Sequence, residues 1–180
     1  MTVPTAVISK TVVCKGTDVV IRQLAEEDRL RLLDFGAALP IDDVMYFEDD
    51  YHSPEIINRL VNASAAENWR QLVAVANNQI VGYSAVRQLP GWSKHVADIR
   101  MLTHPEWRRC GLGTALAGAV FEAARDLGVD KVIVEMLETQ SAGKDIFERL
   151  GFGVEGLLTD HAHDRTGQRH NMLILAYHIR

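Results

Sequence analysis

The segment Arg108–Thr114 carries the residue types best suited to chemistry, because two adjacent arginines precede Cys110 and the glycines at 111 and 113. Glycine lets the backbone approach a ligand without a Cβ in the way, and a helix that begins here presents unpaired N–H groups. With the guanidinium groups and the positive end of the helix dipole, these donors predict an anion site that suits a pyrophosphate. The alternative is a strand-to-helix turn that needs glycine only for its own geometry. The neighbouring elements must decide between the two.

The composition of the chain limits its class. With 180 residues, 47% of them hydrophobic, the sequence predicts a single domain over residues 1–180. A formal charge of -5 and the lack of a basic block argue against a nucleic-acid partner. No apolar run is long enough to span a bilayer and no secretory leader is recognisable, so we expect a cytoplasmic protein with no membrane partner. Cys14 and Cys110 form no CxxC pair, which indicates neither a disulfide framework nor a metal site.

Two helices are expected between the first strands. Apolar residues at helical spacing predict a helix over residues 26–38, which Pro40 ends. Ser53 is a natural N-cap and Pro54 suits the first helical position, so a second helix begins there. The apolar residues at helical spacing are Leu30, Leu33 and Ala37 in the first helix, and Ile56, Leu60 and Val61 in the second. Strands are predicted at 17–23, 70–76 and 80–86, the last two joined as a hairpin through Asn77–Asn78.

The second half of the chain alternates strands with helices. A strand over residues 95–103 leads into the glycine turn, and an amphipathic helix follows as far as Gly128. The β-branched residues in 131–137 predict a central strand. The last expected elements are a short helix ending at Leu150 and two strands, 152–161 and 171–179. This order predicts an α/β (α+β) fold with a mixed central sheet of six to seven strands and helices on both faces.

The glycine turn and its surroundings resemble a known superfamily. Arg108, Gly111 and Gly113 fit the pattern Gln/Arg-x-x-Gly-x-Gly/Ala, which marks the acyl-CoA pyrophosphate loop of the GNAT N-acetyltransferases. The likeness extends over about residues 95–155: segment 102–108 resembles the strand-to-loop stretch before this loop, and segments 134–136 and 147–152 resemble the next strand and the short helix ending in Gly-Phe. The resemblance implies the GNAT fold, in which two parallel strands splay apart and hold CoA, and an acyltransferase activity.

The resemblance also implies the cosubstrate, which is acetyl-CoA or another short acyl-CoA, with no metal. A dinucleotide would require a third glycine where this chain has Leu116. Departures from the family pattern are Gln140, where Asn is frequent, and Phe147, where Tyr commonly protonates the departing thiolate. The residues expected to hold the cosubstrate are Met101, Leu102, Thr103, Arg108, Arg109, Cys110, Gly111, Leu112, Gly113, Thr114, Gln140 and Phe147.

The amine acceptor must lose a proton, since an alkylammonium has a pKa of about 10.4. Asp98 is the first candidate for the base, because Ala97-Asp98-Ile99 resembles the Ala-Glu-Ile of some family members and a charge in a buried strand needs a reason. The alternative is an ion pair of Asp98 with Arg100 or Lys94. Glu135 is a second candidate base. By resemblance, the backbone N–H near Leu102 would stabilise the oxyanion.

The acceptor is expected to meet the loop 41–52, which holds five acidic residues and no Lys or Arg. Such a loop would attract a cationic amine, and its aromatic rings could contact the apolar stem. The candidates are Tyr46, Phe47, Glu48 and Tyr51; the alternative is a solvated surface loop. His161, His163 and His170 follow no metal-ligand spacing and are interpreted as surface or packing residues.

These observations predict an N-acetyltransferase that moves an acetyl group from acetyl-CoA to a primary amine by direct transfer in a ternary complex. The acidic loop favours a small cationic amine as the acceptor. Two alternatives stay open, a protein lysine or N-terminal acetyltransferase and a catalytically silent acyl-CoA-binding or regulatory domain. The resemblance also allows a homodimer.

Overall fold

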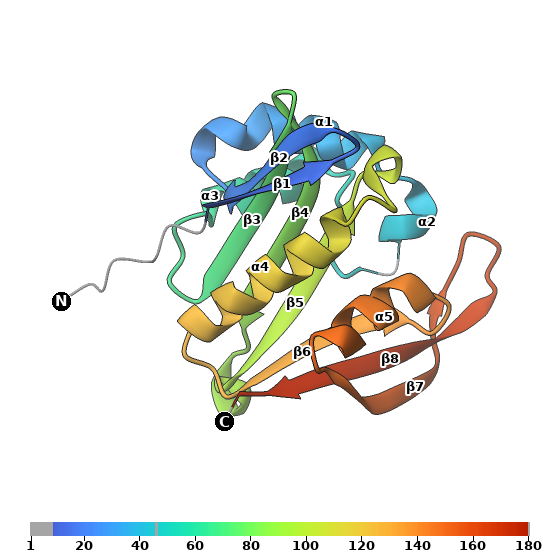
Figure 1. The fold of residues 1–180 in the computed structure, drawn as a ribbon. Coiled ribbons are helices and arrows are strands. Elements are labelled where there is room, and N and C mark those ends of the chain that lie inside the picture. Colours follow the sequence, from blue (N-terminus) through green and yellow to red (C-terminus); the bar gives the residue numbers. More distant parts are fainter. Residues whose placement is uncertain (1–8, 46, 180) are drawn as a thin grey trace.

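The computed structural model describes residues 9–45 and 47–179, which build an eight-stranded mixed sheet in the order β1-β2-β3-β4-β5-β6-β8-β7 (Figure 1). The expected six to seven strands omitted β1 (Ser9–Cys14), which pairs antiparallel with β2 (Thr17–Gln23). Lys15 and Gly16 join them with φ angles of 51° and 73°. That conformation is typical of a two-residue hairpin turn. The sequence feature that indicates this hairpin is Lys15-Gly16 between two pairs of valines.

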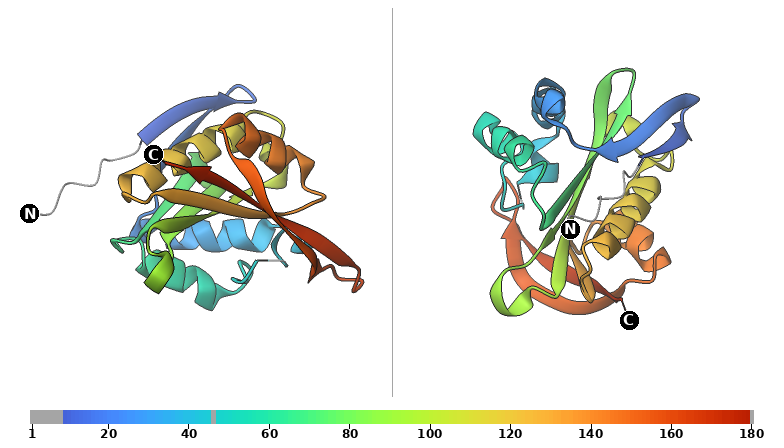
Figure 2. Two further views of the ribbon diagram at one scale, coloured as in Figure 1. Left: turned by 90° about the horizontal axis from the view of Figure 1, so that it is seen from below. Right: turned by 90° about the vertical axis from the view of Figure 1, so that its left-hand side faces the viewer.

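The other strands are β3 (Trp69–Ala76), β4 (Gln79–Gln88), β5 (Val96–Thr103), β6 (Lys131–Leu137), β7 (Gly153–His163) and β8 (Arg169–His178). The helices are α1 (Arg29–Ala38), α2 (Ile41–Val44), α3 (Pro54–Asn62), α4 (Leu112–Asp126) and α5 (Ser141–Arg149), with 3-10 turns at Glu26–Asp28, Gly91–Ser93 and Pro105–Trp107. Helices α1 and α3 cover one face of the sheet, and α4 and α5 cover the other (Figure 2). No helix within the described residues is long and apolar enough to cross a membrane.

Helix α1 buries a different face from the one that the apolar spacing suggested. It begins at Arg29 after the 3-10 turn, and its buried residues are Leu32, Phe35 and Gly36. Leu30 is 74% exposed. The reason is packing: Gly36 lies against the backbone of Tyr51, where a larger residue would not fit.

Helix α3 starts as predicted. The Ile56 N–H donates to Ser53 Oγ at 3.4 Å, and Pro54 is the first helical residue. Its core face comprises Ile57, Leu60 and Val61, with Ile56 only partly buried. The cap fixes the start of the helix, and the predicted buried face is confirmed at Leu60 and Val61, with Ile57 in place of Ile56.

The parallel strands β5 and β6 separate part-way along their length, as predicted. They pair only from Val96–Lys131 to Ile99–Val134, yet β5 continues to Thr103 and β6 to Leu137. Strand β4 stays paired with β5 as far as Thr103, and β8 stays paired with β6 as far as Leu137. The sheet therefore opens between β5 and β6 beyond Ile99, at the carboxyl ends of both strands.

Candidate active site

The backbone of β5 beyond Ile99 presents polar groups to the opening between β5 and β6. On the β4 side, His104 N–H donates to Val81 O at 2.9 Å and Leu89 N–H donates to Val96 O at 2.8 Å. Even-numbered residues of β5 therefore bond toward β4, and the register pairs Leu102 with Tyr83. By the same alternation, Met101 and Thr103 direct their N–H and C=O groups toward the opening.

This alternation corrects the expected oxyanion donor. Leu102 cannot offer its N–H to a ligand in the opening, because that group lies on the β4 side of the strand. Its side chain is also buried, at 6% exposed. Met101 and Thr103 are the residues of the predicted set whose backbone can pair with an extended ligand arm.

The glycine turn before α4 has the conformation of an open cradle. Gly111 has a φ of 85° and Arg109 a φ of 57°, both in the left-handed region. A Cβ at position 111 would meet no atom within 4 Å, so the φ angle rather than space favours glycine there. The 15-residue helix α4 follows, and its early bond runs from Ala115 N–H to Gly111 O at 3.1 Å. The preceding N–H groups lie at the helix start, where anions bind.

Other predicted cosubstrate contacts take different positions. Arg108 forms an ion pair with Asp43 of α2 and donates to Thr103 O at 3.2 Å. Leu112 is fully buried, so only its backbone can contribute. Phe147 is 2% exposed and packs edge-on against Phe152, with ring centroids 5.2 Å apart, so its ring has no access to a ligand. Gln140 precedes α5, and its Oε1 accepts from Leu137 N–H at 3.0 Å.

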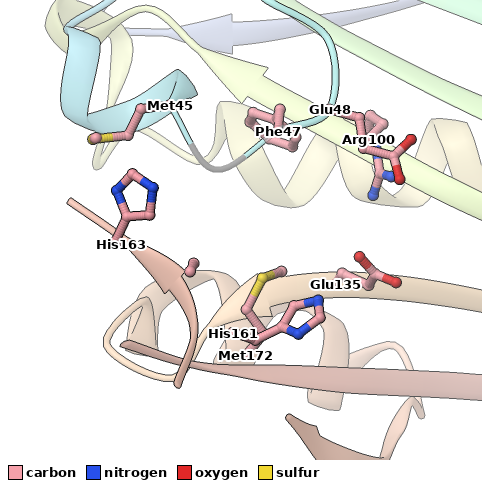
Figure 3. Close-up of a pocket in the computed structure, with 9 residues that line it drawn as sticks. Met45, Phe47, Glu48, Arg100, Glu135, His161, His163 and Met172 are labelled. Carbon is pink, nitrogen blue, oxygen red and sulfur yellow. The ribbon is translucent and has the colours of Figure 1, made fainter. Parts of the chain in front are cut away.

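A cavity of about 230 Å³ lies where β5 and β6 separate (Figure 3). Arg100 and Glu135 come from the first residues of β5 and β6 beyond their last parallel pair. Glu48 lies beside Arg100, and the Glu135 carboxylate points up toward both of them. The complete lining is Met45, Phe47, Glu48, Arg100, Glu135, His161, Ala162, His163 and Met172. One end of the cavity is thus charged, and the rest is lined by two histidines together with apolar side chains.

Asp98 lies behind Arg100, on the same face of β5. Arg100 Nη2 is 2.9 Å from Asp98 Oδ2, and Nη1 is 3.3 Å from Oδ1. Burial raises the pKa of Asp98 to about 7; Arg100 opposes this rise, and the carboxylates of Glu135 and Glu48 add to it. The ion pair expected as an alternative is present, and the carboxyl still titrates near neutral pH.

The predicted acceptor residues divide into three groups. Phe47 and Glu48 line the cavity, and the Arg100 guanidinium lies 5.9 Å from the Phe47 ring centroid. Tyr51 is 3% exposed and packs against Phe47 and Tyr83, so it supports the wall from behind. Tyr46 lies outside the described residues.

Several cavity residues escaped sequence reasoning. Arg100 was named only as a possible partner of Asp98, although period-two alternation along β5 puts both on one face. His161 and His163 are exposed, in agreement with their interpretation as surface residues, and both also line the cavity, because β8 of the β7–β8 hairpin pairs with β6. His170 pairs instead with Asp164, at 3.0 Å. Met45 and Met172 carried no motif that would have marked them.

Strands β5 and β6 splay open beside the start of helix α4, which is the arrangement that the resemblance to the GNAT fold implies. The model of the acetyltransferase (GNAT) family matches residues 35–152. The chain therefore belongs to the GNAT family, and it is an acyltransferase.

Similar proteins support this assignment. A [ribosomal protein bS18]-alanine N-acetyltransferase from Haemophilus influenzae is 26% identical over 113 residues, which are 63% of this chain and 75% of that protein. A GNAT-family acetyltransferase from Streptococcus pneumoniae shares the fold with a TM-score of 0.78 at 19% identity, covering 89% of this chain and 99% of that one. The protein yncA from Salmonella typhimurium, whose structure contains its cofactor acetyl-CoA, gives a TM-score of 0.76 at 16% identity over 90% of this chain and 94% of that one.

Proposed function

We propose that this protein transfers an acetyl group from acetyl-CoA to the primary amine of a small cationic molecule, by direct transfer in a ternary complex. The observation that carries the proposal is the cavity where β5 and β6 separate, with Glu48 and Glu135 at its charged end beside Arg100, whose charge is paired with Asp98. At about 230 Å³, the cavity is smaller than most sites for drug-sized ligands. An ammonium group would be attracted by the two carboxylates, and a short stem would contact Phe47 and Met172.

The residues present fit acetyl-CoA as the acyl donor. Met101 and Thr103 would pair with the pantetheine arm through their backbone groups, and the N–H groups of residues 109–114 would hold the pyrophosphate. When bound, acetyl-CoA supplies an activated thioester carbonyl. The N–H of Met101 or Thr103 would stabilise the negative charge that develops on the carbonyl oxygen during transfer.

The acidic residues of the site would have different roles: two would bind the ammonium group of the acceptor, and one would accept its proton. Glu48 and Glu135 line the cavity and would hold the ammonium form. Asp98, with a pKa of about 7, is suited to take a proton at neutral pH, directly or through water. Phe147 supplies no acid, so solvent would protonate the thiolate; a thiol pKa of about 8.5 makes that requirement modest.

A polypeptide N-terminus is the second candidate acceptor. The relative from Haemophilus influenzae carries a name that specifies the alanine of a ribosomal protein, which favours a protein acceptor for this chain as well. An N-terminal ammonium would meet the same pair of acids, but the rest of the polypeptide would have to leave the cavity. The third candidate, a silent acyl-CoA-binding domain, predicts binding without turnover.

Thiol release from acetyl-CoA in the presence of small amines and of short peptides tests the proposal. We expect turnover with small cationic amines, and a decrease of about tenfold or more in kcat/KM for Glu135→Gln. Glu122→Gln, on the exposed face of α4, is the matched control and should behave as the wild type. Calorimetry measures acetyl-CoA binding separately. Binding without any thiol release would favour the silent domain, and turnover of peptides alone would favour the protein acceptor.

A further inference from the structure

Helix α2 connects two parts of the site through neighbouring acids. Arg165, in the turn between β7 and β8, makes a two-point ion pair with Asp42: Nε lies 2.7 Å from Oδ1 and Nη2 lies 2.9 Å from Oδ2. Asp43 holds Arg108 of the loop before α4. In Figure 1 the short helix α2 lies between that loop and the tip of the β7–β8 hairpin. The Asp42–Arg165 ion pair therefore forms a bridge between α2 and the β7–β8 hairpin.

The bridge lies beside a second cavity, which adjoins the candidate acceptor cavity. This second cavity, of about 340 Å³, is lined by Asp42 and Arg165, and it shares Met45, Ala162 and His163 with the first. Gln140, one of the residues expected to hold the cosubstrate, lines this second cavity as well. Asp42 and Arg165 do not line the first cavity. An acceptor that extended from the charged end past His163 would therefore meet this ion pair.

Both sides of the bridge are held in place by other contacts. Val44 of α2 is 3% exposed in the core, and Asp43 is tied to Arg108. On the hairpin, Asp164 accepts from Thr166 N–H at 2.8 Å, Thr166 Oγ1 at 2.6 Å and Gln168 N–H at 3.1 Å. Arg165 thus projects from an ordered turn toward an anchored helix, and its side chain needs little further ordering to meet Asp42.

We propose that the Asp42–Arg165 ion pair is a specificity determinant that disfavours polypeptide acceptors by closing the outer end of the acceptor groove. This inference rests on the proposed function. A peptide whose N-terminal amine reached Glu135 and whose chain left the cavity past His163 would pass between α2 and the hairpin and part the pair. Exposed ion pairs contribute up to about 1 kcal/mol, equivalent to about fivefold in selectivity, and the bulk of the arginine side chain adds to this.

Selectivity is measured as the ratio of kcat/KM for an alanine-led hexapeptide to that for alaninamide, which share the same amine. Arg165→Ala and Asp42→Ala are each expected to raise this ratio about fivefold or more, without changing acetyl-CoA affinity. The exchanged pair Asp42→Arg with Arg165→Asp should bring the ratio back toward the wild-type value. Arg169→Ala is the matched control, since Arg169 is exposed on the same hairpin and outside the cavity lining, and it should leave the ratio unchanged.

The possible outcomes separate the two proposals. If acceptors are acetylated but Arg165→Ala leaves the ratio unchanged, the specificity role is wrong and the proposed function stands. The specificity role is equally wrong if the exchanged pair keeps the raised ratio of the single variants. If no acceptor is acetylated by the wild type or any variant, while acetyl-CoA binds, the proposed function fails and the specificity role fails with it.

Discussion

Asp98 should make the folded protein progressively less stable as the pH rises from about 4 to about 8. Its pKa is about 7 in the folded protein against 3.8 for an unperturbed side chain, chiefly because burial disfavours the charged carboxylate. The folded state therefore binds the proton more tightly than the unfolded state. The stability from this preference is fully present below the unfolded pKa, and it is lost as the pH rises through the folded pKa. A shift of about 3 units corresponds to about 4 kcal/mol.

The variant Asp98→Asn tests this reasoning, because its amide stays neutral throughout the range. Urea unfolding of wild type and variant at pH values from 4 to 8 gives the difference in unfolding free energy at each pH. Loss of the pair with Arg100 adds an offset at every pH, so the diagnostic quantity is the slope. We expect the difference to move by about 4 kcal/mol in favour of the variant between pH 4 and pH 8.

A second carboxyl supplies the control. The pKa of Glu55 is lowered, because its own backbone N–H and the Ser53 hydroxyl stabilise the carboxylate. Stability from such a group is present above its unfolded pKa and is lost only as the pH falls below about 4. Glu55→Gln should therefore run parallel to the wild type from pH 5 to 8. If Asp98→Asn also ran parallel, the pKa of this carboxyl would be the same in the folded and unfolded states, and Asp98 could not serve as a base that titrates near neutral pH.

Three further substitutions test the packing around the site. Gly36→Ala would put a Cβ 2.2 Å from the Tyr51 carbonyl oxygen, so we expect a loss of about 2 kcal/mol in thermal unfolding; an unchanged midpoint would contradict this tight approach. Asp28→Asn removes a fully buried carboxylate that accepts from Arg22 at 2.6 and 2.8 Å, and denaturant titration should show a loss of about 2 kcal/mol or more. Phe147→Tyr would bury a hydroxyl in the core, so unfolding should show a loss of about 1–3 kcal/mol and thiol-release assays no gain in kcat; a faster enzyme would mean that the ring reaches the thiolate.

Local chemistry made the starts of helices predictable from the sequence. Ser53 and Pro54 marked the beginning of α3, and the glycine turn marked the beginning of α4, because caps and positive φ angles depend on a few adjacent residues. The buried face of α1 was not predictable in the same way. Leu30 and Leu32 both belong to apolar sets at helical spacing, and only packing against Tyr51 and α3 selects the second set.

The candidate site shows the same difference between features set by adjacent residues and features set by tertiary packing. The loop expected to hold the cosubstrate could be singled out because its residues are contiguous, whereas the candidate acceptor cavity is assembled from segments far apart in the chain. Period-two alternation could have placed Arg100 beside Asp98 on one face of β5. It could not have decided which edge of each β5 residue faces β6, and this is why the backbone groups that face the opening are those of Met101 and Thr103 and not that of Leu102. His161 enters the cavity only because the last hairpin pairs beyond β6.

The short parallel pairing of β5 with β6 also has a mechanical consequence. Four residue pairs join the backbone of β1–β5 to that of β6–β8, so the sheet consists of two wings that meet along a narrow seam. A ligand arm lying in the opening would act as an additional strand and extend that seam by hydrogen bonding to Met101 and Thr103. Cosubstrate binding would then stiffen the enzyme across its weakest line, and the amide protons of these two residues would exchange slowly with solvent only in the complex.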